Sequence, residues 1–183
     1  MKVLDLFCGL KGLSKAFSDR GHEVISIDIS SKFMPTLCWD VMGLSPDHIE
    51  HYGPFDVILA SPPCEEFSKA SMPDSWNKNR IVNPDTKLLE KTVELIRYLK
   101  PKYWVIENVR GAVPFFEPII GKPVRHVGSR YLWGNFPMFD TAPKYGKWKL
   151  SPSPDRPAKR ALIPYSLSMA LCLSCELFTV GGK

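Results

Sequence analysis

The chain has 183 residues, a length that fits one domain of ordinary size. Apolar residues make up 44% and charged residues 23%, which excludes a disordered chain, a collagen and a disulfide scaffold. No apolar run approaches the ~18–20 residues that span a membrane. The charged, strand-like start predicts that no signal peptide is present.

The net charge of +5 is concentrated in one short stretch. Residues 141–160 hold six basic side chains and one acidic side chain, and the rest of the chain is balanced. We therefore expect any electrostatic attraction to a partner to act through this stretch.

Five cysteines, an odd number with uneven spacing, predict reduced thiols and a cytoplasmic protein. Cys172 and Cys175 form a lone CxxC pair in a predicted helix. Since a second pair of ligands is missing, we expect both to be core residues and no metal to be bound.

In the first sixty residues the pattern predicts three strands, at Lys2–Phe7, Glu23–Asp28 and Phe55–Ala60. A glycine turn follows the first strand. Leu13, Ala16 and Phe17 then mark one face of a helix that Gly21 ends.

Residues 65–86 are polar and predict a long loop, a candidate lid. A helix follows, with Asn83 as its cap, Pro84 at its first position and Pro101 at its end. Tyr103–Ile106 predicts a strand, residues 125–133 an extended segment, and Tyr165–Phe178 a closing helix. The alternation of strands and helices predicts an α/β fold with a mostly parallel sheet.

Ligands of parallel sheets bind beyond the carboxyl ends of the strands, and two segments at such ends suit a nucleotide-like ligand. The glycines of residues 5–12 let the backbone approach a ligand, although glycine turns after strands are also common. Asp28 suits the two hydroxyls of a ribose, or is a solvated turn carboxylate. Asp40 could accept a hydrogen bond from an adenine amino group.

Two further strand ends suit catalysis. The prolines of residues 61–68 make a rigid loop that presents Cys64 as a nucleophile, unless Cys64 is a buried structural cysteine. Burial would raise the pKa of Glu107 so that it could donate a proton. An ion pair at the strand end is the alternative for Glu107.

The order of three motifs resembles the cytosine carbon-5 DNA methyltransferases. They are Phe7-x-Gly9-x-x-Gly12, Pro62-Pro63-Cys64-x-x-Phe67-Ser68 and Glu107-Asn108-Val109. The resemblance covers residues 1–110 and implies a Rossmann-like class I methyltransferase fold, with helices on both faces of the sheet. It further implies one catalytic domain, residues 1–183, with a shortened C-terminal part.

The resemblance implies a role for each matching residue. Cys64 would add to carbon 6 of cytosine, Glu107 would contact N3, and Arg130, with Arg125 as the fallback, would contact the ring. The S-adenosylmethionine site would comprise Asp5, Phe7, Cys8, Gly9, Leu10, Gly12, Asp28, Ile29, Asp40, Val41, Leu88, Ser166 and Leu167.

The resemblance also implies that double-stranded DNA is the partner and that the target base is flipped out of the helix. Residues 134–163 lie where the family keeps its recognition region, and they are either a minimal basic reader or a surface loop. Residues expected at the DNA are Ser68, Lys144, Lys147, Trp148, Lys149, Arg156, Lys159 and Arg160.

The chain departs from the family pattern at Glu65, where glutamine is usual, and in the broken Arg-x-Arg motif around Arg130. Transfer RNA as substrate and a catalytically inactive DNA-binding relative remain the alternatives. The missing third glycine disfavours a nicotinamide dehydrogenase. We expect a monomer in the cytoplasm of a bacterial or phage-infected cell, with an accessory specificity protein as a candidate partner and no membrane contact.

Overall fold

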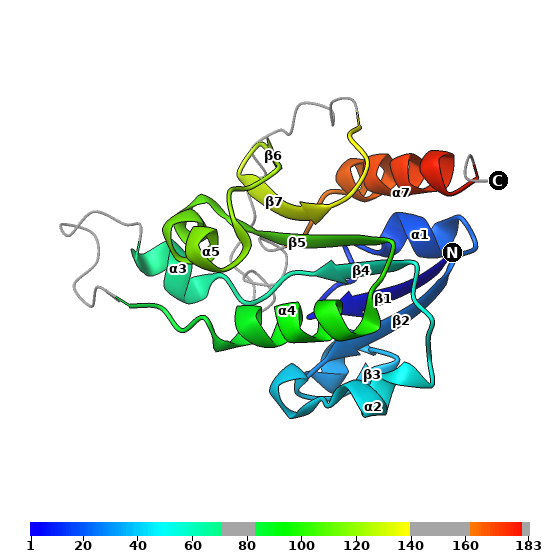
Figure 1. Cartoon of the computed structure of the whole chain (residues 1–183), viewed down its shortest axis with the longest axis horizontal. Helices are drawn as coiled ribbons and strands as arrows, with labels where there is room; N and C mark the ends of the chain where they lie inside the picture. Colours follow the sequence, from blue (N-terminus) through cyan, green and yellow to red (C-terminus); the bar gives the residue numbers. More distant parts are fainter. Residues whose placement is uncertain (71–82, 140–161, 181–183) are drawn as a thin grey trace.

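The computed structural model describes residues 1–70, 83–139 and 162–180 (Figure 1). Its strands are β1 (Lys2–Leu6), β2 (Glu23–Asp28), β3 (Leu37–Cys38), β4 (Val57–Ala60), β5 (Tyr103–Val109), β6 (Arg125–Val127) and β7 (Arg130–Asn135). Its α-helices are α1 (Lys15–Asp19), α2 (Pro46–Glu50), α3 (Glu65–Ala70), α4 (Lys87–Leu99), α5 (Val113–Ile120) and α7 (Tyr165–Val180). Three short 3-10 helices are η1 (Ser31–Phe33), η2 (Val41–Gly43) and η3 (Arg110–Ala112).

The seven strands form one sheet in the order β3-β2-β1-β4-β5-β7-β6. The first five strands of this order run parallel, whereas β7 pairs antiparallel with both β5 and β6. The predicted α/β fold with a mostly parallel sheet is therefore confirmed. The order reverses at β1 and β4, so a crevice for a ligand is expected beyond their carboxyl ends.

Alternation along the buried strands gives the sheet two apolar faces. In β1, Leu4 and Leu6 join the cluster under α4 and α5, while Val3 joins the cluster under α1 and α7. Figure 1 shows α1 and α7 together on one side of the sheet and α4 on the other. The expectation of helices on both faces is confirmed.

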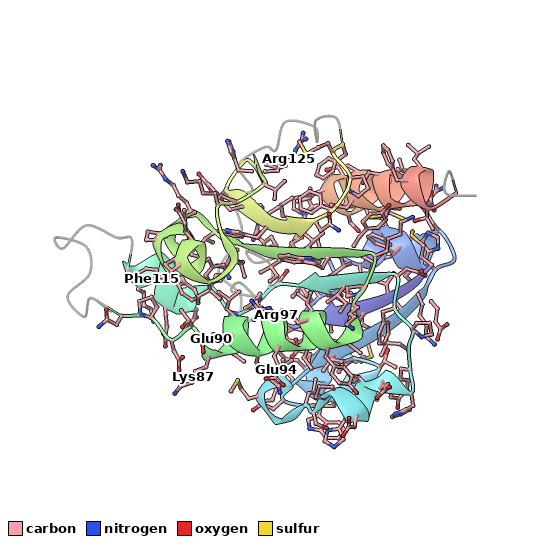
Figure 2. The ribbon with its side chains drawn as sticks, in the orientation of Figure 1. Lys87, Glu90, Glu94, Arg97, Phe115 and Arg125 are labelled. Atoms are coloured by element: carbon pink, nitrogen blue, oxygen red, sulfur yellow. The ribbon has the colours of Figure 1, made fainter. Side chains whose placement is uncertain are left out.

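Helix α4 has the apolar face that the sequence predicts, since Leu89, Val93 and Ile96 are buried. Its outer face carries the exposed charged residues labelled in Figure 2: Lys87, Glu90, Glu94 and Arg97. The predicted start was wrong, because Thr86 and not Asn83 occupies the N-cap position.

Two other element predictions need correction. The expected loop 65–86 begins as helix α3, because Phe67 is buried and packs edge-on against Phe116 with ring centroids 5.1 Å apart. Figure 2 shows the neighbouring Phe115 on α5, the helix that α3 packs beside. Strand β5 continues to Val109, so Glu107 lies within the strand rather than after it.

Helix α7 closes the fold against α1. The Ser168 hydroxyl accepts from the Ala16 amide (3.0 Å) and donates to the Leu13 carbonyl (2.6 Å), which locks the two helices together. Cys172 and Cys175 are fully buried, which confirms their expected role in the core. Within residues 1–70, 83–139 and 162–180, no helix has the length and apolarity needed to cross a bilayer.

Glu176 ties α7 to the start of the chain. Its carboxylate accepts from Arg20 through both oxygens (2.8 and 2.7 Å) and pairs with His22 at 2.8 Å. His22, Cys172 and Glu176 could geometrically hold a metal ion. Both oxygens of Glu176 are already engaged by Arg20 and His22, which disfavours a metal at this cluster. The expectation that no metal binds stays a prediction.

Candidate active site

The turn after β1 has an unusual backbone. Phe7, Gly9 and Lys11 all have positive φ, at 59°, 46° and 58°. A left-handed aromatic residue costs about 1–3 kcal/mol and persists only where surrounding contacts enforce it. The Cys8 amide supplies one such contact by donating to the Ile27 carbonyl at 3.0 Å.

Gly9 is the point where the turn opens to a ligand. A Cβ added there would meet no atom within 4 Å, so the backbone faces open space. Its amide donates to Asp28 Oδ2 at 2.9 Å, which joins the turn to the end of β2. Exposed backbone at such a turn suits close approach by a ligand.

Asp5 lies beneath this turn and is 1% exposed. It accepts a hydrogen bond from the Ser14 hydroxyl at 2.5 Å. Burial raises the pKa of Asp5 to about 7, although the Ser14 bond and the nearby Lys11 charge lower it. The carboxyl group therefore titrates near neutral pH at the floor of the site.

A cavity of about 210 Å³ opens at the ends of β1 and β4. Its lining includes the six turn residues that were predicted to hold a cofactor: Asp5, Phe7, Cys8, Gly9, Leu10 and Gly12. It also includes five residues that the sequence did not point to: Leu13, Phe33, Ser61, Leu162 and Ile163. The last two are far away in the chain, so no local pattern could place them here.

Gly12 explains why the far segment can reach the cavity. A Cβ at Gly12 would lie 2.8 Å from the backbone nitrogen and oxygen of Ile163 and from Leu162 Cδ1. Only a residue without a side chain allows such contact, so Gly12 serves the packing of this wall.

The expected ribose and adenine residues lie around the ends of β2 and β3. Asp28 Oδ1 accepts from the Ser30 amide at 2.9 Å, in addition to the bond from Gly9. Ile29 is 70% exposed, an apolar surface beside that carboxylate. Asp40 is exposed and its Oδ1 accepts from the Met42 amide at 2.9 Å.

Four other predicted cofactor residues are not brought to the cavity wall. The Val41 and Leu167 side chains are buried in the two core clusters, and their expected contact with a cofactor stays a prediction. Leu88 and Ser166 are half-buried, and neither is among the residues that line the cavity. Leu162 and Ile163, a few residues before Ser166 and Leu167, do line it.

The loop carrying Cys64 starts at the cavity and is held from the side. The Asn108 side-chain amide, itself 1% exposed, donates to the Pro62 carbonyl at 3.0 Å. The Cys64 carbonyl accepts from the Ser68 amide at 2.9 Å, which places Cys64 at the start of α3. Cys64 is half-buried, unlike a structural cysteine of the core.

Glu107 neighbours Asn108 in β5 and is 5% exposed. Arg130 Nη1 donates to its Oε1 at 3.2 Å. Burial raises the pKa of Glu107, and the Arg130 charge acts in the opposite direction. Both expectations for Glu107, a raised pKa and an ion pair, are thus met in one arrangement.

Ser61 stands between the cavity and Glu107. Its hydroxyl is buried and completes no hydrogen bond with the described residues, although it lies near enough to Glu107 to lower the pKa of that carboxyl slightly. Ser61 belongs to the predicted loop of residues 61–68, but a serine before two prolines has no sequence pattern that would assign it a role at the site.

The fallback arginine points elsewhere. Arg125, labelled in Figure 2, packs its guanidinium over the Phe139 ring, 4.4 Å from the centroid. Arg130 is therefore the arginine at Glu107. Ser68 lies on α3 next to the Cys64 loop. The other residues expected at the DNA lie outside the described residues: Lys144, Lys147, Trp148, Lys149, Arg156, Lys159 and Arg160.

Only the two ends of the expected recognition segment, residues 134–163, lie within the described residues. Gly134 and Asn135 complete β7, and Phe136, Phe139 and Ile163 are buried. The recognition role of the segment stays a prediction, and its residues 140–161 lie outside the described part of the chain.

A family profile described as C-5 cytosine-specific DNA methylase matches residues 1–115. The matched stretch contains the glycine turn, Cys64 and Glu107. The chain belongs to this family.

Curated relatives agree with this family assignment. A probable DNA (cytosine-5)-methyltransferase of Frog virus 3 is 33% identical over 120 residues, covering 59% of this chain and 53% of that protein. The type II methyltransferase M1.HphI of Haemophilus parahaemolyticus is 31% identical over 124 residues, covering 60% of this chain and 32% of that protein. The chain thus matches about half and one third of the length of these relatives.

A solved structure supports the fold. The Entamoeba histolytica methyltransferase EhMeth superposes with a TM-score of 0.56 at 20% identity, covering 82% of this chain and 57% of that one. At this identity the likeness concerns architecture alone, and it agrees with the class I methyltransferase fold expected from the sequence.

Proposed function

We propose that this protein moves a methyl group from S-adenosylmethionine to carbon 5 of cytosine in DNA. One observation carries the proposal. The Cys64 loop begins at the cavity wall with Ser61 and is fastened at Pro62 by Asn108, next to the buried Glu107–Arg130 pair. This arrangement supports Cys64 as the nucleophile and Glu107 as the acid, with Arg130 as the cation paired with that acid.

The described residues fit the cofactor. The open backbone at Gly9 suits close approach, the Asp28 carboxylate suits ribose hydroxyls, and the exposed Ile29 suits the face of an adenine. When bound, S-adenosylmethionine would supply an electrophilic methyl group on its sulfonium sulfur. The chain's membership of the methyltransferase family does not depend on this fit, because it follows from the family profile.

The side chains would perform the remaining chemistry. The Cys64 thiolate adds to carbon 6 while the Glu107 carboxyl protonates or hydrogen-bonds N3, which makes carbon 5 nucleophilic. After methyl transfer, carbon 5 would lose its proton to a water molecule that acts as base. The electron pair of that bond re-forms the carbon 5–carbon 6 double bond and expels the Cys64 thiolate, and N3 returns its proton to Glu107. The raised pKa of Glu107 favours the protonated carboxyl that this sequence of steps needs.

Access to the base requires its removal from the duplex, since carbon 6 is covered by stacking. The basic stretch 141–160 is the part of the chain proposed to contact phosphates during this step. We further propose a monomer, with sequence choice contributed in part by an accessory protein.

The test is transfer of a labelled methyl group from S-adenosylmethionine to unmodified DNA and, in parallel, to transfer RNA. Label in DNA cytosine is the expected result. Label only in RNA would assign the same chemistry to the other substrate. No label in either, with folded protein, would overturn the proposal.

The nucleophile is tested with DNA that contains 5-fluorocytosine, which should trap the protein covalently because the carbon-5 substituent cannot leave. Cys64→Ala should abolish both the trapped complex and methyl transfer. Cys38→Ser is the matched control, since Cys38 is an exposed thiol on β3. Equal trapping by the Cys64→Ala variant would contradict the assignment.

A further inference from the structure

We infer that Arg130 is a positioning residue for the cofactor site, and that it couples this site to the target-base site. The inference rests on the proposed function for the identity of the two ligands. It assigns Arg130 a second role, exerted through the backbone of Leu162, that is separate from any contact with the cytosine ring.

Two of the bonds that the guanidinium group of Arg130 makes connect the two sites. Nη1 donates to Glu107 Oε1 at 3.2 Å, and Nη2 donates to the Leu162 carbonyl at 3.2 Å. The Arg130 side chain is 14% exposed, so solvent competes weakly for the bond to Glu107, whereas the bond to the Leu162 carbonyl lies at an exposed position. A planar, forked donor can hold two acceptors at once, which the point charge of a lysine cannot do in the same geometry.

Leu162 is a wall of the cavity, as is Ile163 after it. The glycine turn reaches this wall from the other side, where the missing side chain of Gly12 lets the Ile163 backbone approach. The wall is therefore held between Gly12 on one side and Arg130 on the other. Arg130 also bonds to Glu107, so it connects the wall to the base side.

A ligand that fills the cavity presses against this wall, and the Leu162 carbonyl then fixes the guanidinium that faces Glu107. In the other direction, a base bound at Glu107 holds the guanidinium in place and thereby steadies the Leu162 wall. Coupling of this kind is reciprocal in binding free energy, so each ligand should strengthen the binding of the other by the same factor.

The decisive measurement is calorimetric binding of S-adenosylmethionine to the full chain without any nucleic acid. Arg130→Gln should weaken binding on the order of fivefold, although Arg130 does not line the cavity. Arg130→Lys should give an intermediate affinity. An arginine that acts only on the cytosine predicts no change in this measurement.

Arg125→Gln is the matched control, because Arg125 lies on the same hairpin and contacts Phe139 instead. It should leave the affinity for S-adenosylmethionine unchanged. Thermal unfolding of each variant separates a loss of fold from a loss of the wall. If Arg125→Gln weakens binding as much as Arg130→Gln, a general loss of stability is the cause and the inference is overturned.

The coupling itself is measured by repeating the titration with saturating cytosine-containing DNA. In the unaltered protein DNA should tighten cofactor binding, and in Arg130→Gln this gain should disappear. If Arg130→Gln and the unaltered protein bind S-adenosylmethionine equally well without DNA, the inference is refuted. Methyl transfer by the unaltered protein would still uphold the proposed function in that case. If the affinities are as expected but no methyl group is transferred, the inference stands and the proposed function fails.

Discussion

The proposed cofactor side and the proposed base side of the site are built in different ways. The cofactor side, the turn of residues 5–12 with Asp28, works mainly through backbone: three consecutive odd-numbered residues have positive φ, and amides make the contacts. The base side, comprising Cys64, Glu107, Asn108 and Arg130, works through side chains from three separate segments: the Cys64 loop, β5 and β7.

The two sides also differ in how a buried carboxyl group is stabilised. Glu107 has an arginine within hydrogen-bond distance, whereas Asp5 has the neutral Ser14 hydroxyl as its bonded partner. Burial raises the pKa of both carboxyl groups. The base side thus holds an acid in an ion pair, and the cofactor side holds a buried carboxyl group whose hydrogen-bond partner is neutral.

The largest effect is expected on the base side at Glu107. Glu107→Gln keeps an oxygen for Arg130 but removes the acidic proton, so methyl transfer should fall about a hundred- to ten-thousandfold. Single-turnover transfer with saturating cofactor and DNA measures the loss, and calorimetry should show cofactor binding retained. A rate close to that of the unaltered protein would deny Glu107 its role as acid.

A smaller loss is expected at Asn108, which shapes the base side without touching the base. Asn108→Ala leaves the Pro62 carbonyl buried without its donor, which should cost about 1–3 kcal/mol of unfolding free energy. Turnover should fall more than cofactor affinity, because the Cys64 loop is loosened.

Asn135→Ala is the control, since Asn135 makes a similar bond to the Lys102 carbonyl (3.1 Å) at an exposed position of β7. Urea unfolding and steady-state transfer should show little change there. Equal losses in the two variants would mean that the bond to Pro62 has no special place in the site.

The cofactor side should respond to bulk rather than to charge. Gly12→Ala inserts a Cβ within 2.8 Å of the Ile163 backbone, so we expect a loss of about 1–3 kcal/mol in stability and weaker S-adenosylmethionine binding. In Gly43→Ala the new Cβ would meet Trp39 at an ordinary 3.5 Å, and this variant should behave as the unaltered protein. Unchanged cofactor affinity in Gly12→Ala would mean that the Leu162–Ile163 wall does not contribute to cofactor binding.

The smallest effect on activity is expected at Asp5, and it appears as a pH dependence of stability. The pKa of Asp5 is raised from 3.8 to about 7 in the folded protein, so between these values the folded state binds the extra proton. Stability should therefore fall as pH rises across this window and level off above it. Asp5→Asn should flatten that slope, and parallel urea-unfolding curves for the two proteins would contradict the prediction.

The sequence predicted the sheet because its signals are local. Strand β2 was predicted at its observed bounds, and the buried face of α4 follows from helical spacing alone. The six turn residues expected at a cofactor all line one cavity for the same reason, since consecutive residues share one place in the fold.

Tertiary structure decided what local patterns cannot encode. Residues 65–70 are polar and predicted a loop, yet one burial site between aromatic rings of α5 makes them helical. Leu167 is predicted to contact the cofactor, and only the fold shows that its side chain is buried in the core while Leu162 lines the cavity.

The proposed pairing of Glu107 with Arg130 shows both contributions. The order of the motifs singled out Cys64 and Glu107 through the resemblance to the cytosine carbon-5 DNA methyltransferases, although Glu107 lies within β5 rather than at its end. Which arginine completes the pair depended on the β6–β7 hairpin, whose register sets Arg130 opposite Val109 and turns Arg125 toward Phe139. Register is a property of paired strands, so only the folded sheet could decide it.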